Sequence, residues 1–271
     1  MVTSESIALI GIPLDANSSH LTGPAKGPDA IRRVLHSGSG NHVSEGGVDV
    51  LGALVDVGDI DVENIAGSTS DADVITERVS AVVESGQQII SLGGDHSVTF
   101  PILRGVARHV ENLTVVHIDA HPDLYDDLDG NPLSHASPFA RALEAGCMQR
   151  LIQLGIRTAT EHQREQADRW SVEMIGARAL HQFDPGSISG PVYLSIDLDG
   201  LDPSVAPGVS HHEPGGLTFR EVLDIIESLP GPLVGADIVE LNPDRDVVDM
   251  SAAVAAKLVK EVASAMVQLR Q

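Results

Sequence analysis

The sequence has 271 residues, of which 42% are hydrophobic, and this composition is typical of a folded globular chain near the upper size limit for one hydrophobic core. Seventeen lysines and arginines against thirty-nine acidic residues give a formal net charge of −22 at pH 7. Because this charge repels phosphate backbones, we expect no nucleic acid partner. The charge would attract small cations, although solubility alone also accounts for it.

The cysteine content and the N-terminal sequence indicate a cytoplasmic protein. Cys147 is the only cysteine in the chain, so no intrachain disulfide can form, and we interpret this residue as structural. The first residues, MVTSESIALIG, have no basic residue ahead of the short apolar run and do not resemble a signal peptide. No stretch approaches the roughly 18–20 apolar residues that span a bilayer, so we expect no membrane partner.

Short runs rich in Val, Ile and Leu alternate with longer amphipathic segments along the chain. Uninterrupted apolar runs are typical of strands covered on both faces, and apolar residues at helical spacing predict amphipathic helices. In chain order, the predicted elements are strand 6–11, helix 27–35, strand 50–58, helix 71–85, strand 87–94, helix 98–110, strand 113–120, helix 136–145, strand 150–156, helix 161–170, strand 191–199, helix 218–228, strand 232–241 and helix 251–269. This alternation predicts one α/β domain over residues 1–271, with a mostly parallel sheet and helices on both faces.

Acidic and histidine residues follow several predicted strands, where the ligand crevice of a parallel sheet lies. The motif DAHPD places Asp119, His121 and Asp123 at every second position, and Asp197 and Asp199 have the same spacing. Side chains two apart on a strand share a face, so each set converges. Carboxylates crowded above an apolar sheet repel one another and lose hydration unless a cation binds them. One such acid pair is more often a helix cap or a solvated turn, but the combination favours a metal site.

Six side chains are candidate metal ligands: His96, Asp119, His121, Asp123, Asp197 and Asp199. One tetrahedral zinc needs only three or four ligands, whereas six ligands with bridging carboxylates suit two ions about 3.5–4 Å apart. Oxygen-rich ligation with one imidazole for each ion suggests Mn²⁺, and Zn²⁺, Co²⁺ or Ni²⁺ could compete. Two cations lower the pKa of a shared water molecule, so that hydroxide becomes available as a nucleophile.

Other histidines have weaker patterns. His117 points to the same face as Asp119 but one pleat deeper, so we expect a buried packing or supporting role. His135 precedes a predicted helix, and a surface or capping role explains its spacing equally well. His211 and His212 lie in a Gly/Pro-rich loop, and we interpret them as solvated residues rather than as part of a cleft rim.

These motifs together resemble those of the ureohydrolase family, which includes arginases and agmatinases, and within it they are most similar to plant-type arginases. The matching stretches are GGDHS (93–97), DAHPD (119–123), SHAS (134–137), SIDLDGLDPSVAPG (195–208) and DIVELNP (237–243). Further similarity in residues 11–32, 155–157 and 213–223 extends the resemblance over essentially the whole chain. The combination is highly specific for the family and less specific for the substrate.

The resemblance implies a three-layer α/β/α sandwich of the arginase and deacetylase type, with two Mn²⁺ ions in each subunit. By motif, one ion would be bound by His96, Asp119, Asp123 and Asp197, and the other by Asp119, His121, Asp197 and Asp199. His135 matches the family's proton-shuttling histidine, and Glu240 matches the glutamate that pairs with a substrate guanidinium. Asp123 could pass a proton to the leaving amine, and the products would be urea and an amine. The resemblance also implies a homo-oligomer, either a trimer or a hexamer.

Arginine is the expected substrate, with ornithine and urea as products. Animal-type arginases have GLRDVD where this chain reads GIRTAT (155–160), so their acidic contact to an α-amino group is missing here. Asn131 is our candidate for a contact to the substrate tail. Agmatine, or another guanidino or formimino compound, is the alternative substrate. There are two other hypotheses. One is a deacetylase or phosphoesterase, which a single bound zinc ion in each chain would favour, and the other is a non-enzymatic metal-binding scaffold.

Overall fold

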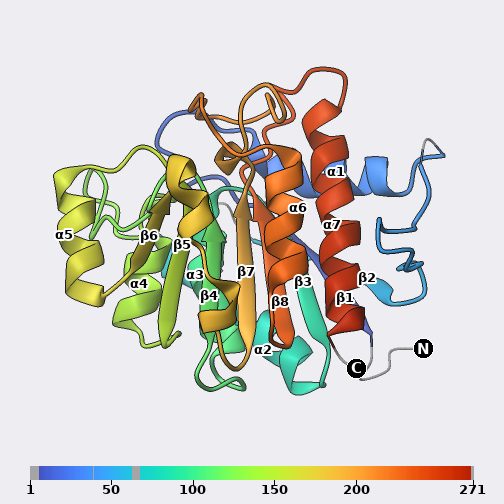
Figure 1. Cartoon of the computed structure of the whole chain (residues 1–271), viewed down its shortest axis with the longest axis horizontal. Helices are drawn as coiled ribbons and strands as arrows, with labels where there is room; N and C mark the ends of the chain where they lie inside the picture. The colour runs from blue at the N-terminus through green and yellow to red at the C-terminus, as the bar shows by residue number, and fades with distance from the viewer. Residues whose placement is uncertain (1–5, 39, 63–67, 270–271) are drawn as a thin grey trace.

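Eight strands form one sheet in the computed structural model, which describes residues 6–38, 40–62 and 68–269. The strands are β1 (Ile7–Ile12), β2 (Leu54–Asp59), β3 (Gln88–Gly93), β4 (Thr114–Ile118), β5 (Arg150–Ile156), β6 (Glu173–Gly176), β7 (Val192–Asp197) and β8 (Leu233–Val239). They lie in the order β2-β1-β3-β8-β7-β4-β5-β6, and each pairing between these neighbours is parallel (Figure 1). All carboxyl ends of the strands therefore lie along the same edge of the sheet.

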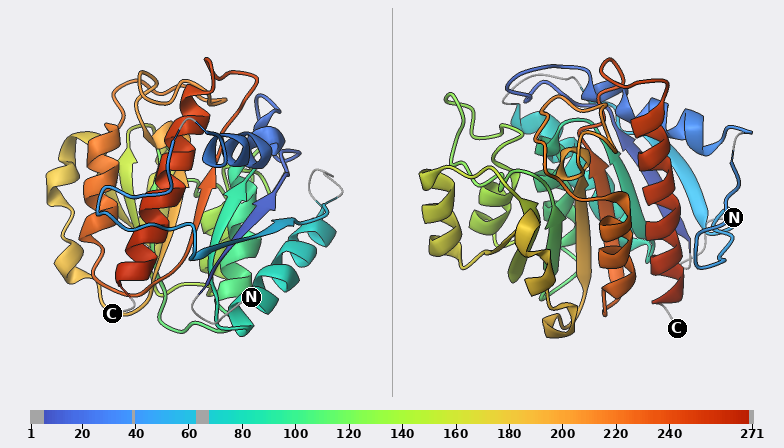
Figure 2. Two further views of the ribbon diagram at one scale, coloured as in Figure 1. Left: turned by 90° about the vertical axis from the view of Figure 1, so that its right-hand side faces the viewer. Right: turned by 45° about the horizontal axis from the view of Figure 1, so that its top comes forward.

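Helices cover both faces of the sheet, as Figures 1 and 2 show. One face carries α1 (Gly27–Leu35), α6 (Phe219–Ser228) and α7 (Met250–Gln268), and the other carries α2 (Thr69–Glu84), α3 (Thr99–Val106), α4 (Pro138–Glu144) and α5 (Glu161–Trp170). The short 3₁₀ turns are η1 (Pro24–Lys26), η2 (His96–Val98), η3 (Ala177–Gln182), η4 (Pro185–Ser187) and η5 (Leu198–Gly200). The apolar side chains form two separate buried clusters, one on each face, so the fold is the predicted three-layer α/β/α sandwich.

The central strands confirm the basis of the sequence prediction. In β4 and β7 every residue is buried, because helices cover both faces and neither face needs polar side chains. Every predicted strand and helix is present, and the predicted bounds of α1, β5 and α5 are those of the structure.

The differences from the prediction lie at the edges of the sheet and at element ends. The predicted strand 50–58 begins only at Leu54, because residues 51–53 form a turn. The predicted helix 98–110 ends at Val106 in a turn over 107–109. Strand β6 was missed, because this edge strand has four residues with an exposed Glu173 at its start and lacks a buried apolar run.

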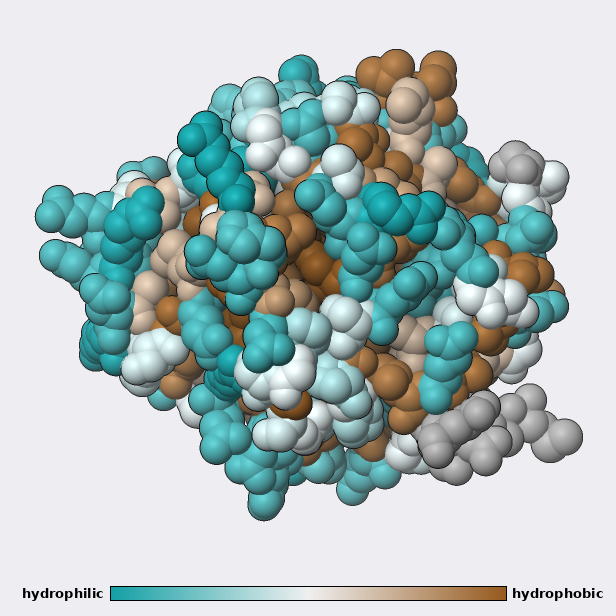
Figure 3. All heavy atoms as spheres, viewed as in Figure 1, coloured by the Kyte–Doolittle hydropathy of each residue, from teal (hydrophilic) through white to brown (hydrophobic). Residues whose placement is uncertain are grey.

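The surface is mostly hydrophilic on the face seen in Figure 3, in keeping with the acidic composition. An apolar projection rises where the loop before α7 lies, and Val247, Val248 and Met250 are exposed in that region. Within the described ranges, no helix combines the length and the apolar character that a bilayer crossing requires.

Candidate metal centre and active site

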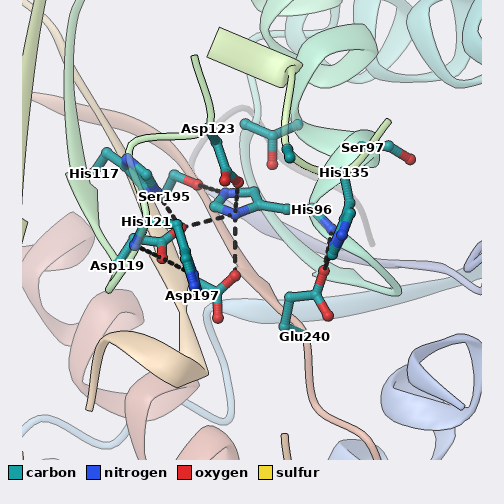
Figure 4. A network of polar contacts seen from close by, with 12 residues as sticks. His96, Ser97, His117, Asp119, His121, Asp123, His135, Ser195, Asp197 and Glu240 are labelled. Atoms are coloured by element: carbon teal, nitrogen blue, oxygen red, sulfur yellow. Dashed lines mark hydrogen bonds and ion pairs between the residues drawn. The ribbon is translucent and has the colours of Figure 1, made fainter. Parts of the chain in front are cut away.

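The candidate ligands and Glu240 lie at the carboxyl ends of four adjacent strands, β3, β8, β7 and β4. His96 begins η2 directly after β3, Asp119 follows β4, Asp197 ends β7, and Glu240 follows β8. The turn after β3 needs a glycine, because a Cβ on Gly94 would lie 1.8 Å from the carbonyl oxygen of Leu14. Figure 4 shows these side chains turned toward one another above the sheet.

His96 lies among three carboxylates. Its Nδ1 atom is 3.2 Å from Asp119 Oδ2, 3.0 Å from Asp123 Oδ2 and 3.1 Å from Asp197 Oδ2. All four side chains are buried. Four potential ligand atoms from three segments of the chain thus surround one point, as ligands of a single cation would.

The hydrogen bonds of His96 show why this group fits a metal ion. The hydroxyl of Ser195 donates its single hydrogen to Asp237 Oδ1 at 2.7 Å, so it can only accept from His96 Nε2, which is 3.0 Å away. A neutral His96 therefore carries its proton on Nε2 and directs the bare lone pair of Nδ1 at three carboxylates. This buried Nδ1 has no hydrogen-bond partner among the described residues. A bound cation would satisfy both the lone pair and the carboxylates.

Without a metal ion, protons bound to the ligand side chains neutralise part of the negative charge. Once Nδ1 is protonated, it can donate to Asp119, Asp123 and Asp197. Burial alone would lower the pKa of His96, but these three acceptors outweigh burial and raise it well above its usual value. Burial and the neighbouring charges of Asp199 and Asp119 raise the pKa of Asp197 well above its usual value. The site thus concentrates more negative charge than it can hold as free carboxylates.

A second group of ligand atoms adjoins the first. His121 Nδ1 lies 3.3 Å from Asp119 Oδ1 and 3.2 Å from Asp199 Oδ2. Asp119 therefore presents one oxygen to each group, as a bridging carboxylate would. Burial, followed by the charge of Asp119, raises the pKa of Asp199 to about 7. The two groups together contain all six candidate ligands, and Asp119, His121 and Asp199 are close enough to hold one ion.

His117 also lies within reach of the first group, beside His96 and Asp119. Its two ring nitrogens are engaged, because Nδ1 is 3.1 Å from the amide nitrogen of Gln153 and Nε2 is 2.8 Å from Asp119 Oδ2. An amide nitrogen only donates, so Nδ1 accepts and Nε2 donates to Asp119. His117 is fully buried and orients the carboxylate, in agreement with the supporting role predicted for it.

His135 and Glu240 form a buried pair beside the metal ligands. Their Nδ1 and Oε1 atoms are 2.9 Å apart, and the same carboxylate oxygen accepts the backbone N–H of His96 at 2.9 Å. Burial alone would lower the pKa of His135, but the charge and hydrogen bond of Glu240 raise it to about 9. On its other side, His135 Nε2 is 2.8 Å from the hydroxyl of Ser19, whose residue is exposed. The buried imidazole is thus no surface residue.

A cavity of about 190 Å³ opens above these groups. Its buried end is acidic, and the rest of its wall is neutral or histidine. The lining residues are Ser19, His121, Asp123, Tyr125, Leu128, His135, Ala136, Thr158, Thr160, Gln163, Asp197, Asp199, His211 and Glu240. His96 and Asp119 lie beneath this surface, and both are buried.

One of the two loop histidines, His211, differs from its predicted place. His211 was interpreted as solvated, but its ring lines the cavity, 5.3 Å from the His135 ring and 5.8 Å from the His121 ring between centroids. The loop folds inward because Asp202 accepts the backbone N–H groups of Gly215 and Gly216. The sequence of the loop alone does not show that these two ends meet. His212 is exposed, as predicted.

The candidate tail contact, Asn131, does not belong to the cavity wall. Its amide nitrogen donates to Asn17 Oδ1 at 3.1 Å, and its amide oxygen accepts the backbone N–H of Leu133. Instead, Thr158, Thr160 and Gln163 line the outer wall. The sequence held one signal for this wall. In the GIRTAT stretch (155–160), Thr158 and Thr160 stand where animal-type arginases have acidic residues, and both threonines line the cavity.

An entirely parallel α/β/α sandwich with two adjacent His/Asp groups at the carboxyl edge defines an α/β protein with a candidate dinuclear metal centre. The sequence profile of the arginase family matches residues 5–264. The chain is 46% identical to "Arginase 1, mitochondrial" of Arabidopsis thaliana, over 96% of this chain and 80% of the relative, and 35% identical to "Agmatinase, mitochondrial" of Gallus gallus, over 94% and 79%. The solved structure of the arginase from Medicago truncatula superimposes with a TM-score of 0.90 at 43% identity, covering 97% of this chain and 88% of that one. The chain belongs to the arginase family, a family of hydrolases.

Proposed function

We propose that the chain is a dinuclear metal amidinohydrolase that converts arginine to ornithine and urea. The observation that carries this proposal is the pair of ligand groups that share Asp119 and adjoin the His135–Glu240 pair in one cavity. Relatives from plants that are 43–46% identical and are named arginases support arginine as the substrate. Agmatine is the second candidate, because relatives named agmatinases are also similar over more than 90% of the chain.

The residues that would hold the metals are the six predicted ones. His96, Asp119, Asp123 and Asp197 surround one position, and Asp119, His121 and Asp199 surround the other. Two divalent cations at these positions would polarise a water molecule and supply hydroxide near neutral pH. The oxygen-rich donor set favours two Mn²⁺ ions in each subunit, with Zn²⁺, Co²⁺ or Ni²⁺ as substitutes.

Glu240 is placed to orient the substrate. A carboxylate accepts two parallel N–H bonds from the edge of a planar guanidinium, which fixes the central carbon in one place. Glu240 is 3% exposed, and its backbone is held by a bond from its N–H to the carbonyl oxygen of Gly94. The buried carboxylate would therefore hold a cationic group at the acidic end of the cavity.

Two side chains are placed to move protons. Asp123 lines the cavity and would carry a proton to the leaving amine nitrogen, which must be protonated to depart. His135 lies between Glu240 and the exposed Ser19, and would exchange protons between the cavity and solvent along this route. We thus assign substrate orientation and proton transfer to separate groups.

Other features of the proposal concern the whole chain. We infer one domain over residues 1–271, a homo-oligomer that is a trimer or a hexamer, a cytoplasmic location, and no nucleic acid or membrane partner. Plant relatives are named mitochondrial proteins, so the location rests on this chain's own sequence. The second ligand group around His121 argues against a single-zinc deacetylase, because one ion would leave that group unused.

Urea release from arginine by the Mn²⁺-loaded protein tests the function. We expect the wild-type chain to release urea, and we expect Glu240→Gln to lower kcat/KM by about 100-fold or more, because the charged partner of the guanidinium is lost. Glu111→Gln, which changes an exposed glutamate outside the cavity, is the matched control and should retain activity. Failure of the wild type to release urea from arginine, agmatine or other guanidino compounds would overturn the proposal.

A further inference from the structure

Among the described residues, no acidic side chain lines the outer end of the cavity. The four carboxylates in its lining, Asp123, Asp197, Asp199 and Glu240, are all buried at the strand ends. Toward the mouth the wall is formed by uncharged groups, among them Thr158, which is half-buried, and Thr160, which is exposed. A substrate held by Glu240 would therefore direct its far end toward neutral hydrogen-bonding groups.

This neutral wall is the beginning of helix α5. Thr160 caps the helix. Its backbone N–H and its hydroxyl both donate to Gln163 Oε1, at 3.1 Å and 3.3 Å, while Gln163 N–H donates back to Thr160 Oγ1 at 3.4 Å. This reciprocal capping box fixes both side chains. The N-terminal end of a ten-residue helix also carries partial positive charge, which favours anions.

Gln163 leaves its donor group available in the cavity. The residue is 4% exposed and lines the cavity, and its amide oxygen is already used by Thr160. Among the described residues, the amide nitrogen of Gln163 meets no hydrogen-bond acceptor. This nitrogen is not one of the buried side-chain atoms that lack a partner, so it is open to solvent or to a ligand in the cavity. The donor is therefore available to an acceptor that enters the cavity.

Contacts with the segment after β4 fix the position of this wall relative to the candidate metal centre. The backbone N–H groups of Arg157 and Thr158 both donate to the carbonyl oxygen of Ala120, which directly follows Asp119. Tyr125, also in the lining, stacks on His162 of α5 with ring centroids 5.7 Å apart and planes 15° apart. Residues 119–125, which include the metal ligands Asp119, His121 and Asp123, therefore also contact the outer wall.

We propose that Thr158 and Gln163 form a subsite for the carboxylate of the substrate tail, with Thr160 holding the Gln163 side chain in place. This inference rests on the proposed function and deepens it, because it assigns guanidino carboxylates as the preferred substrate class. The Thr158 hydroxyl and the Gln163 amide, at a helix N-terminus, would donate to a carboxylate, whereas the second cation of agmatine would find no carboxylate on this wall. The exposed Glu161 of the first turn does not line the cavity.

Three substrates separate the carboxylate from the amine. Arginine has both groups, 5-guanidinopentanoate keeps the carboxylate and lacks the amine, and agmatine keeps the amine and lacks the carboxylate. We expect the kcat/KM values of the wild type for both carboxylates to exceed the value for agmatine by about tenfold or more, because a hydrogen bond to a charged group is lost with agmatine.

Gln163→Glu tests the subsite without removing the helix cap. A glutamate at this position still accepts the Thr160 N–H, as in the common capping box, but it replaces the amide donor by a negative charge. We expect kcat/KM to fall about tenfold to 100-fold for arginine and 5-guanidinopentanoate, and to stay level or rise for agmatine. Gln182→Glu, at an exposed glutamine outside the cavity, should leave all three values unchanged.

Equilibrium binding gives a readout independent of turnover. By calorimetry on the Mn²⁺-loaded protein, 5-aminopentanoate should bind more tightly than 1,4-diaminobutane, and Gln163→Glu should reverse this order. Urea release that favours agmatine in the wild type, or equal changes for all three substrates in Gln163→Glu, would overturn the subsite while the proposed function stands. No urea from any guanidino compound would overturn both.

Discussion

Two residues of the candidate site hold backbone conformations that residues with side chains rarely adopt. Asp123 has a φ of 52° and Glu240 a φ of 63°, both in the left-handed region. Such conformations cost roughly 1–3 kcal/mol and persist where the surrounding structure imposes them. Here they turn one carboxylate toward His96 and the other toward His135. The chain thus accepts local strain to aim these two side chains.

The His135–Glu240 pair leads to a prediction for catalysis. Replacing His135 by Asn removes a group that can gain and lose a proton but keeps a polar side chain of similar size. We expect kcat for urea release to fall by roughly 10²–10⁴-fold, the usual contribution of a positioned acid–base group. His36→Asn, at an exposed histidine, serves as the control and should keep its activity. Unchanged kcat in His135→Asn would contradict the assigned role.

The same pair makes stability depend on pH in the metal-free protein. Glu240 raises the pKa of His135 to about 9 in the folded state, above the ordinary value near 6.5. The folded state therefore binds the proton more tightly, so this stabilisation is complete below about pH 6.5 and is lost as the pH rises through about 9. With a chelator present, the difference in unfolding free energy between wild type and His135→Asn should shrink from pH 6 to pH 10. A difference that grows over this range would contradict the pairing.

At the scale of the elements, the sheet carries a buried polar row one step below the ligands. Strand register places five fully buried polar residues side by side across five strands: Ser91, Asp237, Ser195, His117 and Gln153. Within this row, Asp237 accepts a hydrogen bond from the Ser195 hydroxyl, and the Ser195 oxygen accepts one from His96 Nε2. The sheet therefore orients the ligand imidazole from beneath.

Asp237→Asn should weaken metal binding without touching a ligand. An amide is a weaker acceptor than a carboxylate, so the hydrogen bond from the Ser195 hydroxyl to residue 237 becomes weaker. The hydroxyl hydrogen can then turn toward His96 Nε2 and favour the other tautomer of His96. We expect the affinity for Mn²⁺ to fall about 10–100-fold, the usual effect of a residue behind a ligand. Tyr193→Phe removes another hydroxyl bound to Asp237 and leaves Ser195 in place, so it should change the affinity much less. Equal effects in both variants would indicate general destabilisation.

The sequence predicted the elements well where local pattern determines them. Apolar runs identified the central strands because burial on both faces makes most of their residues apolar, whereas β6, a short edge strand, had no such pattern. The ligand residues were predictable because alternate positions share a face and parallel strand ends share an edge. The register that sets Asp237 opposite Ser195 is a relation between strands far apart in sequence, so no local pattern revealed it.

At the scale of the whole molecule, the cavity depends on how distant segments dock. Its lining combines the loop before η1, the segment after β4, the start of α5, and the loop after η5. Thr160, Gln163 and His211 reach the cavity only through this docking, which explains why sequence reasoning placed the tail contact at Asn131 and His211 in solvent. The family resemblance predicted the metal ligands. It did not predict the outer wall, because residues 155–160 differ from the animal-type sequence, and the structure was needed to identify the residues that line the cavity there.

The metal content of the active protein shows whether Asp119 and the five other candidate ligands hold two adjacent cations. Elemental analysis of fully active, Mn²⁺-loaded protein should give two ions for each chain. Asp199→Asn, which alters only the group around His121, should reduce this number toward one. One ion or none for each chain in fully active wild-type protein would contradict the account.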